Sequence, residues 1–502
     1  MRTKSVEQSI AETDEPEHRL KKNLGTLDLI IFGVGVIIGA GIFVITGTVA
    51  KTNSGPAITL SFAIAGLACA LAALCYAEFA STVPVAGSAY TFSYATFGEL
   101  VAWIIGWDLA LEFTIGSAAL ATSFSGYFQE VVEGTFLEVP ASLGSAAGGV
   151  LDLPAVVISL LVTGVLIAGI KLSSVLNQVV VAIKLLVVGA VIVFGISHIQ
   201  AANYSPFIPE SKPAPEGGGG FLDSTLISSL LGIDPAVYGL AGVVAGASIV
   251  FFAFIGFDIV ATTAEETVNP QRDVPRGILG SLAIVTVLYM AVSLVVTGMQ
   301  NYTEIDASDA APLATAFNSV GMEWMGRLIA IGACIGLIVV VMILMLGQTR
   351  VGFAMARDGL LPVGLAKVHP RFGTPYVITA ITGVAVALIG GLVDLETLVN
   401  LVSIGTLFAF VLVSVGVVIL RRRRPDLPRS FRTPAVTVVA SASVLLCLYL
   451  MLNLTGGTWV RFLVWMAVGV VFYFAYGRSH SRVGLRSGGD RPSSTSGPRA
   501  GA

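Results

Sequence analysis

The chain has 502 residues with a mean hydropathy of +0.87, and 55% of its residues are hydrophobic against 12% charged. This charged share is about half of that in a soluble domain, which excludes an ordinary cytoplasmic enzyme. The formal net charge of -3 is too small to indicate a nucleic-acid partner, and no basic stripe with interleaved aromatic residues is present.

Residues 1–27 precede the first apolar stretch. They carry five basic and five acidic side chains, whereas a cleaved signal peptide has a short positive start followed by a brief apolar core. We therefore expect no signal peptide and interpret 1–27 as a cytoplasmic N-terminal segment.

Apolar stretches then follow one another along the chain, each near the roughly 20 residues that a membrane-spanning helix needs. They cover residues 28–50, 57–82, 100–127, 154–172, 175–198, 239–263, 278–300, 327–352, 375–393, 397–420, 434–452 and 459–477. The sequence thus predicts an all-α polytopic membrane protein with 12 transmembrane helices.

Basic residues give the orientation, because Lys and Arg concentrate in cytoplasmic loops. With the N-terminus inside, 23 of the 28 basic residues fall inside and 4 outside, and Lys184 lies within a span. We therefore expect both termini in the cytoplasm, 199–236 as an extracellular loop, 421–477 as the last two spans with a basic cytoplasmic linker, and 478–502 as a disordered cytoplasmic tail.

Several sequence patterns of enzymes and pumps are absent. There is no G-x-x-x-x-G-K-[ST], H-E-x-x-H or G-x-S-x-G. The four histidines lie near predicted span ends or outside the spans, and the four cysteines lie within apolar stretches, where they act as small hydrophobes. We expect no enzyme activity, no metal and no cofactor, and the 56 glycines favour a carrier or a channel.

Two spans carry candidate helix breaks. The first has four glycines in nine positions, and the sixth has Gly256 and Asp258 within the apolar run from Phe251. Because glycine weakens a helix interior, both spans are predicted to unwind at these glycines. In the first span, Gly35-x-x-x-Gly39 also fits a helix-packing motif. Spans one and six correspond in two five-helix halves, 28–198 and 237–420, and paired interruptions of this kind indicate an inverted-repeat transporter.

The exposed backbone of such breaks suits a zwitterion. Free N–H groups at the start of the second half of span one suit a carboxylate, and free carbonyls of span six suit an ammonium. We therefore expect an α-amino acid to bind, with Phe252 or Phe254 as a gate. The backbone candidates are Gly39, Ala40, Gly41 and Ile42 in the first span and Phe252, Ala253 and Ile255 in the sixth.

Charged residues also lie within the spans. Lys184 is roughly 16 Å from the predicted inner end of its helix at 1.5 Å per residue, so it could exchange a proton during transport or act as a fixed structural cation. Asp108 and Glu112 share one helical face. Glu112 is the candidate partner of Lys184, Asp108 could be structural, and Asp258 could contact the ligand or cap a helix.

The same regions resemble the amino acid-polyamine-organocation superfamily, and most closely its cationic amino acid transporter branch. The resemblance covers residues 25 to about 420. Its motifs are Ile37 to Phe43, Ala77-Glu78-Phe79 with Pro84-x-x-Gly87-Ser88-Ala89-Tyr90, Phe251 to Asp258 with Glu265-Glu266-x-x-Asn269-Pro270-Gln271-Arg272-Asp273-x-Pro275, and Gln348-Thr349-Arg350 with Arg357-Asp358-Gly359-Leu360-Leu361-Pro362.

The resemblance implies a leucine-transporter-like fold of two inverted five-helix repeats plus two helices, working by alternating access. It also implies that Lys184 occupies the place of a sodium ion in sodium-driven relatives and faces the carbonyls of Gly35 and Ile38. We therefore expect a proton-coupled amino-acid symporter in the plasma membrane. An amino acid or polyamine exchanger, a non-transporting amino-acid sensor and a channel remain alternatives, and the preference for cationic or neutral substrates stays open.

Overall fold

The computed structural model describes residues 24–82, 90, 93–94, 97–145, 148–169, 174–213, 220–232, 236–307, 309–482 and 484. Most of the predicted N-terminal segment 1–27 and of the tail 478–502 lies outside these residues, as do residues 83–89 of the second family motif. The described chain is almost entirely helical.

The first half of the chain, to residue 198, contains the first five predicted spans. Its helical segments are α2 (Thr26–Ile37), η1 (Gly41–Ile45), α3 (Thr46–Val49), η2 (Ala50–Ser54), η3 (Gly55–Ala57), α4 (Ile58–Thr82), α6 (Glu99–Val132), η4 (Ala141–Leu143), α7 (Leu153–Ile167) and α8 (Ser174–Ile196).

The second half repeats the pattern of long helices joined by short segments. After η5 (Ala201–Tyr204) it contains α9 (Leu226–Leu231), α10 (Gly239–Val250), η6 (Phe251–Phe254), α11 (Ile259–Thr262), η7 (Ala264–Glu266), α12 (Pro270–Met299), α13 (Pro312–Ser319), α14 (Glu323–Arg357), η8 (Val363–Ala366), α15 (Tyr376–Leu392), α16 (Leu395–Arg423), α17 (Val436–Leu452), α18 (Gly456–Phe472), η9 (Tyr473–Gly477) and α19 (Arg478–His480).

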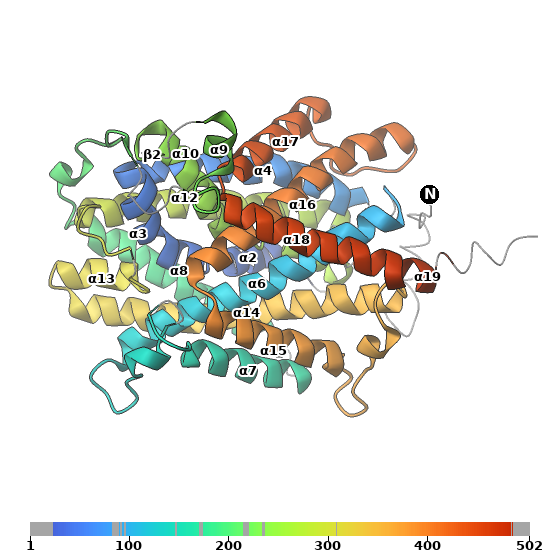
Figure 1. The fold of residues 1–502 in the computed structure, drawn as a ribbon, viewed down its shortest axis with the longest axis horizontal. Coiled ribbons are helices and arrows are strands. Elements are labelled where there is room, and N and C mark those ends of the chain that lie inside the picture. Colours follow the sequence, from blue (N-terminus) through green and yellow to red (C-terminus); the bar gives the residue numbers. More distant parts are fainter. Residues whose placement is uncertain are drawn as a thin grey trace, which may run out of the picture.

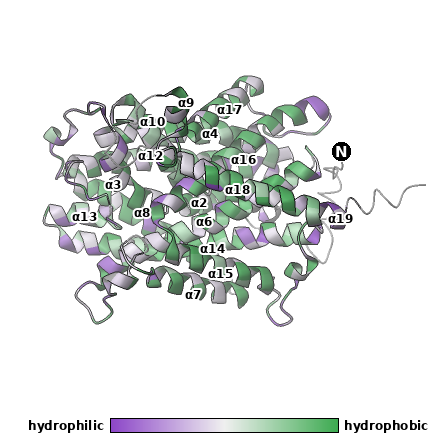
Figure 2. Ribbon diagram, viewed as in Figure 1, coloured by the Kyte–Doolittle hydropathy of each residue, from purple (hydrophilic) through white to green (hydrophobic). Residues whose placement is uncertain are grey.

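Each predicted apolar stretch overlaps helix in the part of the chain that the structure describes. Eight helical segments in the described part are long and apolar enough to cross a membrane, and four shorter apolar helices, α2, α7, α15 and α17, account for further predicted spans. The long helices lie side by side along the long axis of the molecule (Figure 1). Their middle portions are mostly hydrophobic, and hydrophilic residues gather toward the two ends (Figure 2). This is the pattern of a polytopic membrane protein.

The helices pack in two groups. In the first group, α4 packs on both α10 and α12, and α12 also packs on α2. In the other group, α14 and α16 pack on α6, and α15 packs on α7. The interrupted helices therefore belong to the first group, and α6 and α14 lie across from them.

Two predicted irregular regions contain ordered structure. The predicted loop 199–236 includes α9 and a two-residue antiparallel pairing of β1 (Lys212–Pro213) with β2 (Ala236–Val237). The predicted disordered tail begins too early at 478, because Ser481 is buried and its hydroxyl donates a 2.5 Å hydrogen bond to Glu99, while the Arg482 amide donates to the Asp358 carbonyl. These bonds hold the chain beyond α18 against α6 and the end of α14.

The predicted basic linker is also fixed to the helices. Glu78 of α4 is buried, and Arg421 donates two hydrogen bonds of 2.6 Å to its carboxylate. The backbone amide of Thr433, in the linker, donates a third at 2.8 Å. A bidentate arginine of this kind gives a strong, directional contact, so Glu78 joins the first group of helices to the α16–α17 connection.

Candidate substrate site

The first predicted span is interrupted at mid-length. The helix α2 ends at Ile37, and Ile38 is extended with ψ of 95°. The chain is helical again at Ala40 and continues from Gly41 as the π-helical segment η1. Such segments are uncommon and occur often at functional sites. The predicted break is therefore present.

The sixth span is interrupted over a longer stretch. After α10, residues Phe251–Phe254 form a 3-10 turn, Ile255 is extended, and the next helix begins only at Ile259. Gly256 has φ of +110°, a conformation that favours glycine because it has no Cβ. This explains why a glycine lies within the break, after Ile255 and before the next helix.

The two breaks touch each other directly. A Cβ on Gly41 would lie 2.2 Å from the Cα of Ala253, and a Cβ on Gly256 would lie 2.6 Å from a methyl carbon of Val36. Both glycines therefore allow the two backbones to meet. Gly39 differs, because its missing side chain points toward Leu120 at 3.2 Å and Val340 at 3.9 Å.

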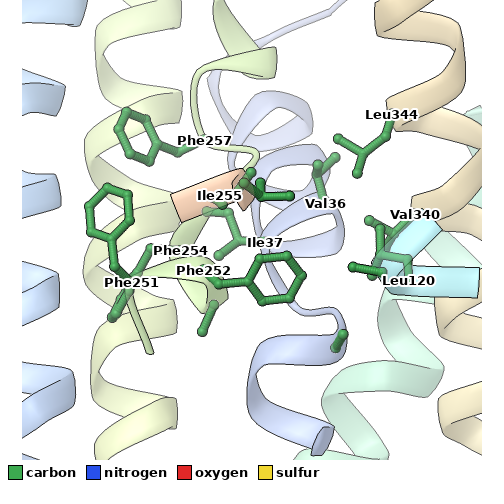
Figure 3. Packing of buried hydrophobic residues seen from close by; sticks show 14 of the residues in the cluster. Val36, Ile37, Leu120, Phe251, Phe252, Phe254, Ile255, Phe257, Val340 and Leu344 are labelled. Carbon is green, nitrogen blue, oxygen red and sulfur yellow. The ribbon is translucent and has the colours of Figure 1, made fainter. Parts of the chain in front are cut away.

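A small cavity of about 20 Å³ lies beside the breaks. The lining residues at the two breaks are Val36, Ile37, Gly39, Ala40, Gly41, Phe252, Ala253 and Ile255. The opposite side is lined by Gly116, Leu120, Val340 and Leu344. Figure 3 shows the side chains of Leu120, Val340 and Leu344 facing Phe252 and Ile255. This volume holds about one water molecule, so an amino acid requires these side chains to move apart.

Six of the predicted backbone residues line this cavity. Ile42 and Asp258 do not line it. Ile42 is fully buried, and its carbonyl accepts a hydrogen bond from Thr46 within the same helix. The structure therefore brings together the predicted contacts from 39 to 41 and from 252 to 255.

The candidate gate Phe254 lies elsewhere. Its ring packs against Phe62 and Tyr289, with centroid distances of 6.3 Å and 5.3 Å. A 3-10 turn has three residues per turn, so Phe251 and Phe254 share one face and Phe252 points to another. Phe252 lines the cavity (Figure 3), and Phe254 does not. A gating role for Phe252 or Phe254 stays a prediction, and the position of Phe252 favours Phe252.

Lys184 of α8 contacts the end of α2. The side chain is 1% exposed, and its ammonium donates hydrogen bonds of 2.7 Å to the Gly35 carbonyl and 2.9 Å to the Ile38 carbonyl. These are the two contacts that the resemblance implied. The expected pairing with Glu112 is wrong, because Glu112 on α6 lies near Asp108 and Asp258 instead.

Three buried carboxylates lie close together in the described part of the chain. Asp108, Glu112 and Asp258 are each at most 1% exposed. Both oxygens of each aspartate and one oxygen of Glu112 accept no hydrogen bond from the part of the chain that the structure describes. Asp258 precedes α11 but does not cap it, because its backbone is already helical (φ -68°, ψ -27°), whereas a capping residue is extended.

Tyr289 is a site residue that the sequence analysis missed. Its hydroxyl lies 2.7 Å from the Ile37 carbonyl oxygen and 2.9 Å from the Ala253 carbonyl oxygen. A tyrosine within an apolar span must bond its hydroxyl to some buried group, and this was the available signal. The apolar residues of α6 and α14 that line the cavity carried no comparable signal.

A second hollow, of about 290 Å³, lies at the far end of α6 from Glu99. Its acidic lining residues are Glu130, Glu133, Glu138 and Asp309. Burial raises the pKa of Asp309, which lies in the loop before α13. Among the described residues no group of three His, Cys, Asp or Glu side chains is arranged to hold a metal ion.

Comparison with known proteins agrees with this architecture. Residues 24–473 match the family described as amino acid permease. The chain is 46% identical to the branched-chain amino acid permease BcaP of Bacillus subtilis (strain 168), over 96% of this chain and 98% of that protein.

Two other relatives show the breadth of the family. The methylthioribose transporter of Bacillus subtilis (strain 168) is 45% identical over 92% of this chain and 95% of its own length. Cationic amino acid transporter 4 of Homo sapiens is 38% identical over 86% of this chain and 64% of its own length. Both are named as transporters.

Proposed function

This chain belongs to the amino acid permease family, within the amino acid-polyamine-organocation superfamily, and from that premise we propose that it is a proton-coupled amino-acid symporter of the plasma membrane. The observation that carries the proposal is the meeting of two broken helices at one apolar cavity. Amide groups at the start of the second half of helix one suit a carboxylate. Carbonyl groups of the second break suit an ammonium.

The lining of the cavity favours a neutral aliphatic side chain. None of the described residues that line it is charged, and the walls opposite the breaks are Gly116, Leu120, Val340 and Leu344. Burying an aliphatic side chain there contributes about 1.5–3 kcal/mol, whereas an unpaired cation would lose its hydration without compensation. The relative named a branched-chain amino acid permease supports the same class.

A cationic amino acid is the second candidate. The acidic hollow at the end of α6 would concentrate cations near the predicted outer mouth, and several relatives are named cationic amino acid transporters. The three buried carboxylates of Asp108, Glu112 and Asp258 could also compensate a cation that enters the membrane interior.

Proton coupling is proposed through Lys184. An ammonium that holds two backbone carbonyls of the first break would hold them more weakly once it loses its proton, because a neutral amine keeps N–H donors but not the charge that strengthens these bonds. Protonation would thereby change the shape of the substrate site. The neighbouring carboxylates of Glu112, Asp108 and Asp258 are further groups that can take up a proton.

Uptake by purified protein in proteoliposomes tests the function. All twenty amino acids and methylthioribose are offered, with and without an inward proton gradient and with sodium present or absent. We expect leucine, isoleucine and valine to be taken up best, more strongly when the outside is acidic, and without dependence on sodium.

The same experiment separates the alternatives. Uptake that requires an amino acid inside the vesicles would indicate an exchanger. Binding without uptake would indicate a sensor. Preferred uptake of arginine and lysine would replace the neutral class by the cationic one, and uptake of methylthioribose alone would overturn the amino-acid assignment.

A further inference from the structure

The hydroxyl of Tyr289 lies between the two helix breaks. Tyr289 comes from α12 and is fully buried. Its oxygen is 2.7 Å from the carbonyl oxygen of Ile37, the last residue of α2, and 2.9 Å from that of Ala253 in η6. One side chain from a third helix thus contacts both interrupted backbones where they border the cavity.

One hydroxyl cannot fully satisfy both carbonyls. A phenol has a single proton to donate, whereas two carbonyl oxygens offer four lone pairs. The carbonyls of Gly35 and Ile38 differ, because the Lys184 ammonium brings three N–H donors to them. The carbonyls of Ile37 and Ala253 therefore keep accepting capacity, and a primary ammonium is the group best suited to fill it.

The tyrosine ring is held in place by aromatic neighbours. Its centroid is 5.5 Å from that of Phe62 in α4 and 5.3 Å from that of Phe254 in η6. Phe62 and Phe254 also contact each other at 6.3 Å. Because rings from two other elements pack against the Tyr289 ring, its hydroxyl has a defined position relative to both breaks.

We infer that Tyr289 is a positioning residue that sets the carbonyls of Ile37 and Ala253 at the spacing at which they jointly receive the substrate's ammonium group. The inference rests on the proposed function and adds to it a third helix that aligns the two broken ones. Tyr289 itself does not line the cavity, whereas Ile37 and Ala253 do. It therefore acts through the two carbonyls.

The variant Tyr289→Phe tests this role, because it removes the hydroxyl and keeps the ring contacts. Uptake of the best amino acid of the panel is measured in proteoliposomes, together with inhibition by its 2-hydroxy analogue, which lacks the ammonium. We expect the KM for the amino acid to rise roughly tenfold, as for one lost hydrogen bond at a charged group. The maximal rate and the inhibition constant of the analogue should stay within about twofold of wild type.

Tyr204→Phe is the matched control. The Tyr204 hydroxyl likewise donates to a backbone carbonyl, that of Leu294 in α12 at 2.6 Å, but Leu294 does not line the cavity, whereas Ile37 and Ala253 do. Its KM should not change. An unchanged KM in Tyr289→Phe, or an equal loss for amino acid and analogue, would overturn the positioning role. Absence of amino-acid uptake by the wild-type protein would instead overturn the proposed function, and with it this inference.

Discussion

Single side chains from neighbouring helices bond the backbone groups that the helix breaks leave free. The Lys184 ammonium bonds the carbonyls of Gly35 and Ile38, and the Tyr289 hydroxyl contacts those of Ile37 and Ala253. Unwound backbone within a membrane is tolerated only with such partners or beside a cavity. These two residues therefore both permit the break and determine its shape.

Removal of the Lys184 ammonium should make amino-acid uptake independent of the proton gradient. In Lys184→Ala the two carbonyls lose their donor and no group there can exchange a proton, so uptake should no longer increase when the outside is acidified, while much of the substrate binding remains. Uptake against imposed pH gradients, with binding measured on the same protein, checks this expectation.

Lys184→Arg gives the matched comparison. A guanidinium can still bond carbonyls but does not lose its proton, so this variant should bind substrate and also lack coupling. Wild-type proton coupling in Lys184→Ala would contradict the assigned role.

Lys184 could be predicted from the sequence because a lone charge within an apolar stretch is rare and costly. Its partners came only from the family resemblance. Glu112 was assigned to it wrongly, because sequence spacing places Glu112 on a helical face but does not say which helix that face meets. Phe252 and Phe254 could not be separated, since the 3-10 turn that points them apart is set by tertiary packing.

At the scale of the elements, glycine decides where the helices can break and how closely they meet. Gly41 and Gly256 lie where a Cβ would overlap the other broken segment, at 2.2 Å from Ala253 and 2.6 Å from Val36. The glycine cluster predicted the first break, and Gly256 the second. The sequence did not reveal that Gly41 packs against Ala253, because that contact joins residues far apart in the chain.

Gly41→Leu should abolish substrate binding, because the side chain would push the two breaks apart and open the spacing between the amide and carbonyl groups. Even a single Cβ has no room at this position. The measurement is equilibrium binding of the best substrate to purified protein, and we expect more than roughly a hundredfold loss, as for several charge-assisted hydrogen bonds.

Gly164→Leu serves as the control for this change. Gly164 lies within α7, and a Cβ there would meet nothing within 4 Å, so affinity should be close to that of the wild type. Normal affinity in Gly41→Leu would contradict the placement of the site at the meeting point of the two breaks.

At the scale of the whole molecule, two groups of helices enclose the site. One group contains the broken helices with α4 and α12, and α6 and α14 provide the opposite wall of the cavity. The Glu78–Arg421 contact joins the first group to the end of α16. Movement of one group relative to the other would open the small cavity, which is how we expect alternating access to work.

Hydropathy and basic-residue placement sufficed to predict a polytopic helical bundle. Hydropathy alone does not determine the number of spans, because α2, α7, α15 and α17 are short and the first helix is divided. The tail was predicted as disordered from its Ser and Gly content, yet Ser481 and Arg482 bond to α6 and to the end of α14. Composition could not indicate those tertiary bonds.

The central claim is that the peptide groups of two broken helices bind both charged groups of an amino acid. Equilibrium binding of one amino acid to the purified wild-type protein, compared with its methyl ester and its 2-hydroxy analogue, tests it most directly. Because each analogue removes charge-assisted hydrogen bonds at one break, each should bind roughly tenfold to a hundredfold more weakly. Equal affinity of the amino acid and either analogue would contradict the claim for the corresponding break.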